Sequence, residues 1–198
     1  MTPLVLWLLR HGEVEGNREF RLLGQRGDPP LTRQGRAEAW RAARKLAARP
    51  LRAVLSSDLR RARETAEAVA RPHQLRPIFL PELRELDFGL WDGLTAEEAR
   101  RGWPELWAAW SADPFAVAPP GGERAGDLEG RLARFLEGLP GLLGGLPGPA
   151  PGAPGEAGAE VAVVTHGGPL RFLWRRLVGR ELEEGWAPGE VRRLRCTL

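Results

Sequence analysis

Two histidines near opposite ends of the chain stand in similar settings. His11 follows the apolar run 4–9 and His166 follows the apolar run 161–164, and a glycine comes directly after each histidine. Each imidazole therefore lies where a predicted buried strand ends and a turn begins. Because ligands in open α/β sheets bind beyond the carboxyl ends of the strands, we expect both histidines to belong to one site.

Several other kinds of catalytic site are excluded by the residues present. The only lysine, Lys45, follows Arg44, so the Gly-Lys-Ser/Thr sequence of a nucleotide-binding P-loop is absent. Cys196 is not followed by the arginine that a cysteine phosphatase needs, and no Gly-x-Ser-x-Gly nucleophile turn occurs. The histidines lack the spacing of metal ligands. We therefore expect neither a metal nor a cofactor.

The hydrophobic periodicity predicts alternating strands and helices that would position such a site. Strands are expected over 4–9, 52–56, 76–80, 161–165 and 191–197. Helices are expected over 32–48, 58–71, 95–111, 124–137 and 168–178, with Thr32 as the N-cap of the first. This rhythm indicates a three-layer α/β/α sandwich with a mostly parallel central sheet.

The length of 198 residues suits a single domain over 1–198. The Gly/Pro/Ala-rich segment 138–159 is expected to form a flexible surface loop, because this composition disfavours regular structure. No apolar run approaches the roughly 18 residues of a membrane span. With one cysteine, no secretory leader and no internal disulfide, we expect a cytoplasmic protein.

Charge and composition bear on partners and source. The formal net charge is +3 and the sequence pI is about 10.2. The arginines are scattered among glutamates rather than gathered in one patch, so we do not expect nucleic acid as a partner. Arginine in place of lysine, many prolines and few Asn, Gln, Met and Cys are typical of a thermophilic source.

Four blocks, in order along nearly the whole chain, resemble the histidine phosphatase superfamily in its phosphoglycerate-mutase-like branch. They are Arg10-His11-Gly12, SDLRRARETA over 57–66, LRELDFGLWDG over 83–93 and Thr165-His166-Gly167-Gly168. The resemblance implies the phosphoglycerate-mutase-like fold. It also implies a small phosphomonoester as substrate.

The resemblance implies a nucleophile and a set of phosphate-binding groups. His11 would attack phosphorus and form a phosphohistidine, which divides one difficult step into two. Arg10 and Arg61 would hold the phosphoryl oxygens with their guanidinium forks, and His166 would add a donor. Two neighbouring cations should also lower the pKa of His11 and keep it neutral.

The remaining site residues follow from the same resemblance. Glu85 would protonate the leaving alkoxide and later accept a proton from water. Asn17, Gly24 and Gly167 would contact the substrate, with the backbone N–H groups of Gly167 and Gly168 facing the phosphate at a helix start.

Alternatives exist for several of these residues. Other acids, Glu82, Asp87 and Asp92, lie in the same stretch as Glu85. Asn17 can instead serve as a turn residue.

The segment 87–122 is expected to select the substrate, because the phosphate pocket of such a site is generic. Trp103, Trp107 and Trp110 recur in it at helical spacing. They can either pack a helical cap onto the core or form a wall of the pocket.

The resemblance leaves three functions open. The short, tryptophan-rich region after Glu85 favours a phosphomonoester hydrolase over a cofactor-dependent phosphoglycerate mutase, whose corresponding region carries a longer basic insertion. A non-catalytic phosphate-binding relative is the third alternative. A homodimer is possible through an edge strand or the tryptophan face.

Overall fold

The centre of the fold is a five-stranded sheet with the strand order β3-β2-β4-β1-β5. The computed structural model describes residues 3–146, 159–180 and 184–197. The strands are β1 (Pro3–Arg10), β2 (Leu51–Ser56), β3 (Ile78–Phe79), β4 (Ala159–Thr165) and β5 (Val191–Thr197). Four strands run parallel, and β5 pairs antiparallel with β1 at one edge. This confirms the predicted mostly parallel sheet.

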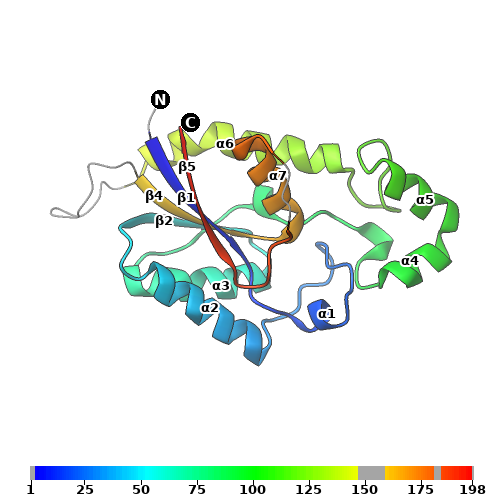
Figure 1. Ribbon diagram of the computed structural model, residues 1–198, viewed down its shortest axis with the longest axis horizontal. Coiled ribbons are helices and arrows are strands. Elements are labelled where there is room, and N and C mark those ends of the chain that lie inside the picture. The colour runs from blue at the N-terminus through cyan, green and yellow to red at the C-terminus, as the bar shows by residue number, and fades with distance from the viewer. Residues whose placement is uncertain (1–2, 147–158, 181–183, 198) are drawn as a thin grey trace.

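Helices cover both faces of the sheet, as expected for a three-layer arrangement. They are α1 (Glu15–Arg18), α2 (Arg33–Leu46), α3 (Arg60–Ala70), α4 (Ala96–Gly102), α5 (Pro104–Ala112), α6 (Ala125–Gly144) and α7 (Gly167–Val178). Figure 1 shows α2 and α3 below the sheet, α6 and α7 above it, and α4 and α5 extending to one side. The hydroxyl of Thr32 accepts the N–H of Gly35 at 2.9 Å, which confirms the predicted N-cap of α2.

Side-chain alternation along the strands produces one apolar core on each face. From β1, Leu4, Leu6 and Leu8 pack toward α6 and α7. The intervening Val5, Trp7 and Leu9 pack toward α2 and α3. Both faces of the central strands are thereby buried, which explains their nearly continuous apolar sequences.

Two predicted elements are shorter or more broken than expected. The helix expected over 95–111 is two helices, α4 and α5, because Trp103 precedes Pro104 and adopts φ −139°, outside the helical region. The strand expected over 76–80 pairs only at Ile78 and Phe79, since β3 is a short edge strand beside β2.

The prediction of a loop beginning at residue 138 is wrong. Helix α6 continues to Gly144 and contains Pro140. Its apolar residues recur at intervals of three or four and are buried against the sheet, through Leu132, Leu136, Leu139 and Leu143 among others. Burial of this stripe outweighs the poor helix propensity of glycine and proline. Of the predicted loop 138–159, residues 147–158 lie outside the described residues, and Ala159 is the first residue of β4.

Within the ranges that the structure describes, no helix combines the length and the apolar character needed to cross a bilayer.

Candidate active site

Three neighbouring parallel strands deliver polar side chains to one edge of the sheet. In the register of β1 and β4, Arg10 lies opposite Thr165, so His11 and His166 follow the two strands side by side. The N–H of His11 donates to the carbonyl of Thr165 at 3.0 Å. The imidazole ring centroids are 5.0 Å apart. The structure therefore brings the two histidines together at one edge of the sheet.

The tautomer of His11 is fixed by its own loop. Its Nδ1 lies 2.7 Å from the carbonyl oxygen of Gly12, which can only accept, so Nδ1 carries the proton. The N–H of Gly12 in turn donates to Thr65 Oγ1 at 3.1 Å. The neutral ring therefore keeps its lone pair on Nε2, the nitrogen that could act as a nucleophile.

The protonation state of His11 also favours a nucleophile. Burial is the largest cause that holds its pKa well below the ordinary value, and the charges of Arg61 and Arg10 lower it further. The sequence predicted this direction from the two cations alone. A neutral imidazole at neutral pH is what an attacking nitrogen requires.

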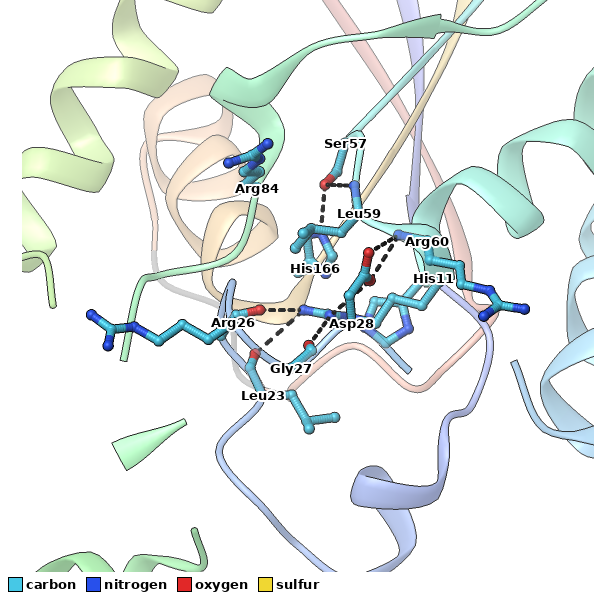
Figure 2. Close-up of polar contacts among 12 residues, drawn as sticks. His11, Leu23, Arg26, Gly27, Asp28, Ser57, Leu59, Arg60, Arg84 and His166 are labelled. Carbon is cyan, nitrogen blue, oxygen red and sulfur yellow. Dashed lines mark hydrogen bonds and ion pairs between the residues drawn. The ribbon is translucent and has the colours of Figure 1, made fainter. Parts of the chain in front are cut away.

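His166 is anchored by a residue to which the sequence assigned no role. Its Nε2 lies 2.8 Å from Ser57 Oγ, and the N–H of Leu59 donates to the same hydroxyl at 3.3 Å. Figure 2 shows this chain of contacts. Ser57 directly follows β2, beside β4, and its N–H donates to the carbonyl of Val164. Nδ1 of His166 is buried and has no partner in the part of the chain that the structure describes.

Arg61 is a fully buried cation at the start of α3. Its Nη1 and Nη2 donate to the carbonyls of Gly27 and Gly24 at 3.2 and 2.8 Å, and Asp28 lies 3.7 Å away. The Asp28 carboxylate also accepts the N–H of Arg60, as drawn in Figure 2. Most of the groups that hold the guanidinium are neutral backbone carbonyls, and Asp28 compensates its charge in part.

Arg10 is held in a comparable way. Its Nη1 donates to the carbonyl of Trp186 at 2.6 Å. Among the described residues, the Nε atoms of both Arg10 and Arg61 are buried without a hydrogen-bond partner. One buried and one half-buried guanidinium group with spare donors, beside a neutral imidazole, form an arrangement suited to a phosphoryl group.

Glu85 lies at the same site. Its Oε1 accepts the N–H of Leu86 at 2.9 Å and its Oε2 accepts the N–H of Gly168 at 3.1 Å. Although the residue keeps some exposed surface, burial of the carboxyl group raises its pKa. The two backbone donors and the charges of Arg61 and Arg10 oppose this rise. A carboxyl group with a raised pKa is a candidate proton donor.

The neighbouring acids have other partners. Both oxygens of Asp92 accept backbone N–H groups, from Gly24 at 3.0 Å and from Arg26 and Gly27 at 2.6 and 3.1 Å. Asp92 thus organises the loop whose carbonyls hold Arg61, a role the sequence did not indicate. The carboxylate of Asp87 accepts the N–H of Gly89 within its own turn.

The secondary substrate contacts predicted from the sequence stay predictions. Asn17 Oδ1 accepts the N–H of Val14 at 3.1 Å, the local bond expected of a turn residue. Gly24 lies against Arg61, to which its carbonyl binds. Gly167 lines the cavity described below. The N–H of Gly168, by contrast, donates to Glu85, so the expectation that it is free to face a phosphate is wrong.

Arg131 of α6 was also missed. It donates from Nη1 to the carbonyl of Glu82, from Nη2 to that of Glu85, and to the carboxylate of Glu123. The amphipathic pattern of α6 carries no signal of this role.

Among the described residues, no group of three or more His, Cys, Asp or Glu side chains is placed to hold a metal ion.

A cavity of about 600 Å³ opens beside Glu85, Arg10 and Gly167. The tryptophans of the segment 87–122 lie in different places relative to this cavity. The fully buried Trp91 packs against Trp107 and Trp110, with ring centroids 5.1 and 5.4 Å away. Trp110 also lines the cavity, whereas Trp103 lies at the break between α4 and α5. Trp107 thus packs onto the buried Trp91, and Trp110 both packs onto it and forms part of the cavity wall.

Comparisons with known proteins agree with this geometry. A bifunctional protein of Mycobacterium tuberculosis is 38% identical over 175 residues, which are 88% of this chain and 44% of that protein. This chain therefore spans less than half the length of that relative. Phosphoserine phosphatase 1 of Hydrogenobacter thermophilus is 30% identical over 184 residues, 93% of this chain and 81% of that one.

A solved structure extends the likeness to the fold. A putative α-ribazole-5′-P phosphatase of Escherichia coli superposes with a TM-score of 0.82 at 28% identity, covering 97% of this chain and 90% of that one. The family model of the histidine phosphatase superfamily (branch 1) matches residues 6–192. The chain therefore belongs to the histidine phosphatase superfamily.

Proposed function

We propose that this protein is a phosphomonoester hydrolase that works through a phosphohistidine at His11. The observation that carries the proposal is the contact between His11 Nδ1 and the carbonyl oxygen of Gly12 at 2.7 Å, which leaves the lone pair of the neutral ring on Nε2. Burial and the charges of Arg61 and Arg10 lower the pKa of His11 and so favour that neutral ring. Arg10 and Arg61 supply the positive charge that a phosphoryl group needs, and Glu85 supplies a proton. We expect no metal in this reaction, because the guanidinium groups supply that charge.

The first step transfers the phosphoryl group to the enzyme. Nε2 of His11 forms a bond to phosphorus as the bond between phosphorus and the ester oxygen breaks. Protonated Glu85 gives its proton to the leaving oxygen, so the alcohol departs neutral. Arg10, Arg61 and His166 hold the three peripheral oxygens, on which charge is spread in the transition state.

The second step returns the enzyme to its starting state. Glu85, now ionised, accepts a proton from a water molecule that attacks phosphorus. The bond from phosphorus to Nε2 breaks, orthophosphate leaves, and His11 is again neutral. Glu85 thus serves as acid and then as base without a net change.

The test is orthophosphate release from a panel of phosphomonoesters, without added metal, by the wild type and by His11→Ala. The panel includes p-nitrophenyl phosphate, 3-phosphoglycerate and phosphoserine. We expect release that is lost in the variant, and a phosphorylated enzyme that is acid-labile and appears only in the wild type.

Two other outcomes would favour the alternatives. Exchange of phosphate between positions of phosphoglycerate without net release would favour a mutase. Phosphate binding with no turnover of any ester would favour a binding protein.

Substrate selection falls to the segment 87–122 in this proposal. Phe88, Trp110, Pro114 and Phe115 of that segment line the cavity beside Glu85. Of the proposed reactive groups, Arg10 and Glu85 line the same cavity, so we expect differences between esters to arise in this wall. We also propose a cytoplasmic location, on the strength of the single cysteine.

A further inference from the structure

The cavity beside the reactive groups is large and rich in aromatic side chains. Its volume of about 600 Å³ lies within the roughly 300–1,000 Å³ typical of drug-sized ligands. Five aromatic side chains line it: Phe88, Trp110, Phe115, Phe172 and Trp186. They come from the cap segment, from α7 and from the loop before β5. A small polar alcohol would leave most of this apolar surface without a partner.

The cavity is placed to receive the group that leaves. Glu85, which gives its proton to the leaving oxygen, lies in the wall, and so does Arg10. The remainder of the ester therefore extends from the phosphoryl site into the aromatic part of the cavity. Gly167, at the start of α7, lines the same cavity.

Charge in the outer wall is compensated in part. Arg175 forms an ion pair with Glu129 and lies over the ring of Phe115, 5.8 Å from the ring centroid. Arg171 is exposed. Beyond the phosphoryl site, apolar contact is therefore the main source of affinity that this wall can supply.

We infer that the substrate is the phosphate monoester of an alcohol that carries a bulky aromatic or apolar group, bound in the cavity between α5, α6 and α7. This rests on the proposed hydrolase function for the chemistry of the ester. It adds the class of the alcohol, and it excludes the smallest polar esters as the preferred substrates.

The test compares two primary alkyl esters, so that the intrinsic reactivity of the leaving group is matched. These are 2-(1-naphthyl)ethyl phosphate and glycerol 1-phosphate. We expect kcat/KM of the wild type to be at least about tenfold higher for the naphthyl ester, since one bulky apolar group contributes roughly this much or more.

Phe115→Ala tests the wall directly. Phe115 is 44% exposed, so its truncation does not hollow the core. We expect kcat/KM for the naphthyl ester to fall by about two- to tenfold, and that for glycerol phosphate to fall clearly less. Trp40→Ala is the matched control, because Trp40 is 45% exposed and lies 5.6 Å from the guanidinium of Arg71, away from the cavity.

A second variant fills the cavity instead of enlarging it. Ala125 lines the wall at the start of α6. Ala125→Trp should lower kcat/KM for the naphthyl ester more than it lowers kcat/KM for glycerol phosphate. Wild-type turnover that depends on His11 but prefers glycerol phosphate, or variants that change both esters equally, would overturn the inference and leave the proposed function standing.

Binding separates the inference from the proposed function. The non-hydrolysable 2-(1-naphthyl)ethyl phosphonate is titrated calorimetrically into the wild type and Phe115→Ala. If no ester is hydrolysed, the proposed function fails. Binding of the phosphonate that weakens in Phe115→Ala would then still support the aromatic site, whereas equal binding by both proteins would reject it.

Discussion

Ser57 Oγ and His166 Nε2 lie 2.8 Å apart, and both groups are buried. The other ring nitrogen of His166, Nδ1, has no partner among the described residues. When the Ser57 hydroxyl donates its proton to Nε2, the neutral ring carries its own proton on Nδ1. Nδ1 can then donate to a bound phosphoryl oxygen. We therefore predict that Ser57 is a positioning residue that acts through His166.

Ser57→Ala should lower kcat by roughly two- to tenfold, the value of one intramolecular hydrogen bond of about 0.5–1.5 kcal/mol. KM should change little, since Arg10 and Arg61 still hold the phosphate. Steady-state kinetics on one alkyl phosphate measure both. Ser56→Ala is the control, because Ser56 is equally buried but donates to the carbonyl of Ser57 instead of to a site residue. An equal loss in both variants would show that Ser57 only supports the fold.

The role of Glu85 predicts a dependence on the leaving group. Glu85→Gln should lower kcat/KM for alkyl phosphates by roughly 10²–10⁴-fold, the usual contribution of a general acid. The leaving group of p-nitrophenyl phosphate needs no proton. For this ester, the rate of the first step, phosphoryl transfer to the enzyme, should therefore fall much less. Burst kinetics separate that step from hydrolysis of the phosphoenzyme. If Glu85→Gln lowered the burst rate equally for both kinds of ester, Glu85 would not be the general acid.

A glycine variant tests the placement of the same carboxyl group. A Cβ at Gly168 would lie 2.3 Å from Glu85 Oε1, so Gly168→Ala must displace the carboxyl group. We expect it to reproduce the leaving-group dependence of Glu85→Gln. Gly130→Ala is the control, because a Cβ there meets only the flexible guanidinium of Arg134, 3.6 Å away. If Gly168→Ala showed the same dependence on the leaving group as the wild type, the carboxyl group of Glu85 would tolerate the displacement.

The site illustrates what could be predicted from the sequence. The apolar runs before His11 and His166 predicted strands, and parallel pairing of those strands brings the imidazoles together in register. No local pattern links Ser57 to His166 or Arg131 to Glu85, because these contacts arise from the packing of distant elements. Likewise, the glycines and Pro140 of α6 indicated a loop locally, but burial of the leucine stripe of that helix against the sheet decides the outcome.

The two site histidines predict a pH-dependent stability. Burial, together with nearby arginines, lowers the pKa of both His11 and His166 well below 6.5 in the folded protein. Below pH 6.5 the unfolded chain therefore binds protons that the folded protein does not. Stability should fall as the pH drops from 6.5 toward the folded pKa values, by up to about 1.4 kcal/mol per pH unit for each histidine.

The measurement is the free energy of unfolding in urea at several pH values between 7.5 and 5. His166→Gln should flatten the pH dependence, whatever its effect on stability at pH 7.5. His73, whose pKa burial also lowers, contributes equally to both proteins and does not disturb the comparison. A slope that is unchanged in His166→Gln would show that His166 titrates normally in the folded protein.

The contacts of Arg131 link helix α6 to the backbone of Glu85, the proposed general acid. Its guanidinium binds the carbonyls of Glu82 and Glu85 and the carboxylate of Glu123, and it is only 12% exposed. Arg131→Met leaves these acceptors without their donor, so the midpoint of thermal unfolding should fall and kcat should fall with it. Arg134→Met, one turn away on the exposed face of α6, should leave both unchanged.

Because Arg131 touches the backbone of Glu85 and not the reacting atoms, the loss in kcat should be larger for alkyl than for p-nitrophenyl esters, as in Glu85→Gln. A loss in thermal stability alone would limit Arg131 to a structural role.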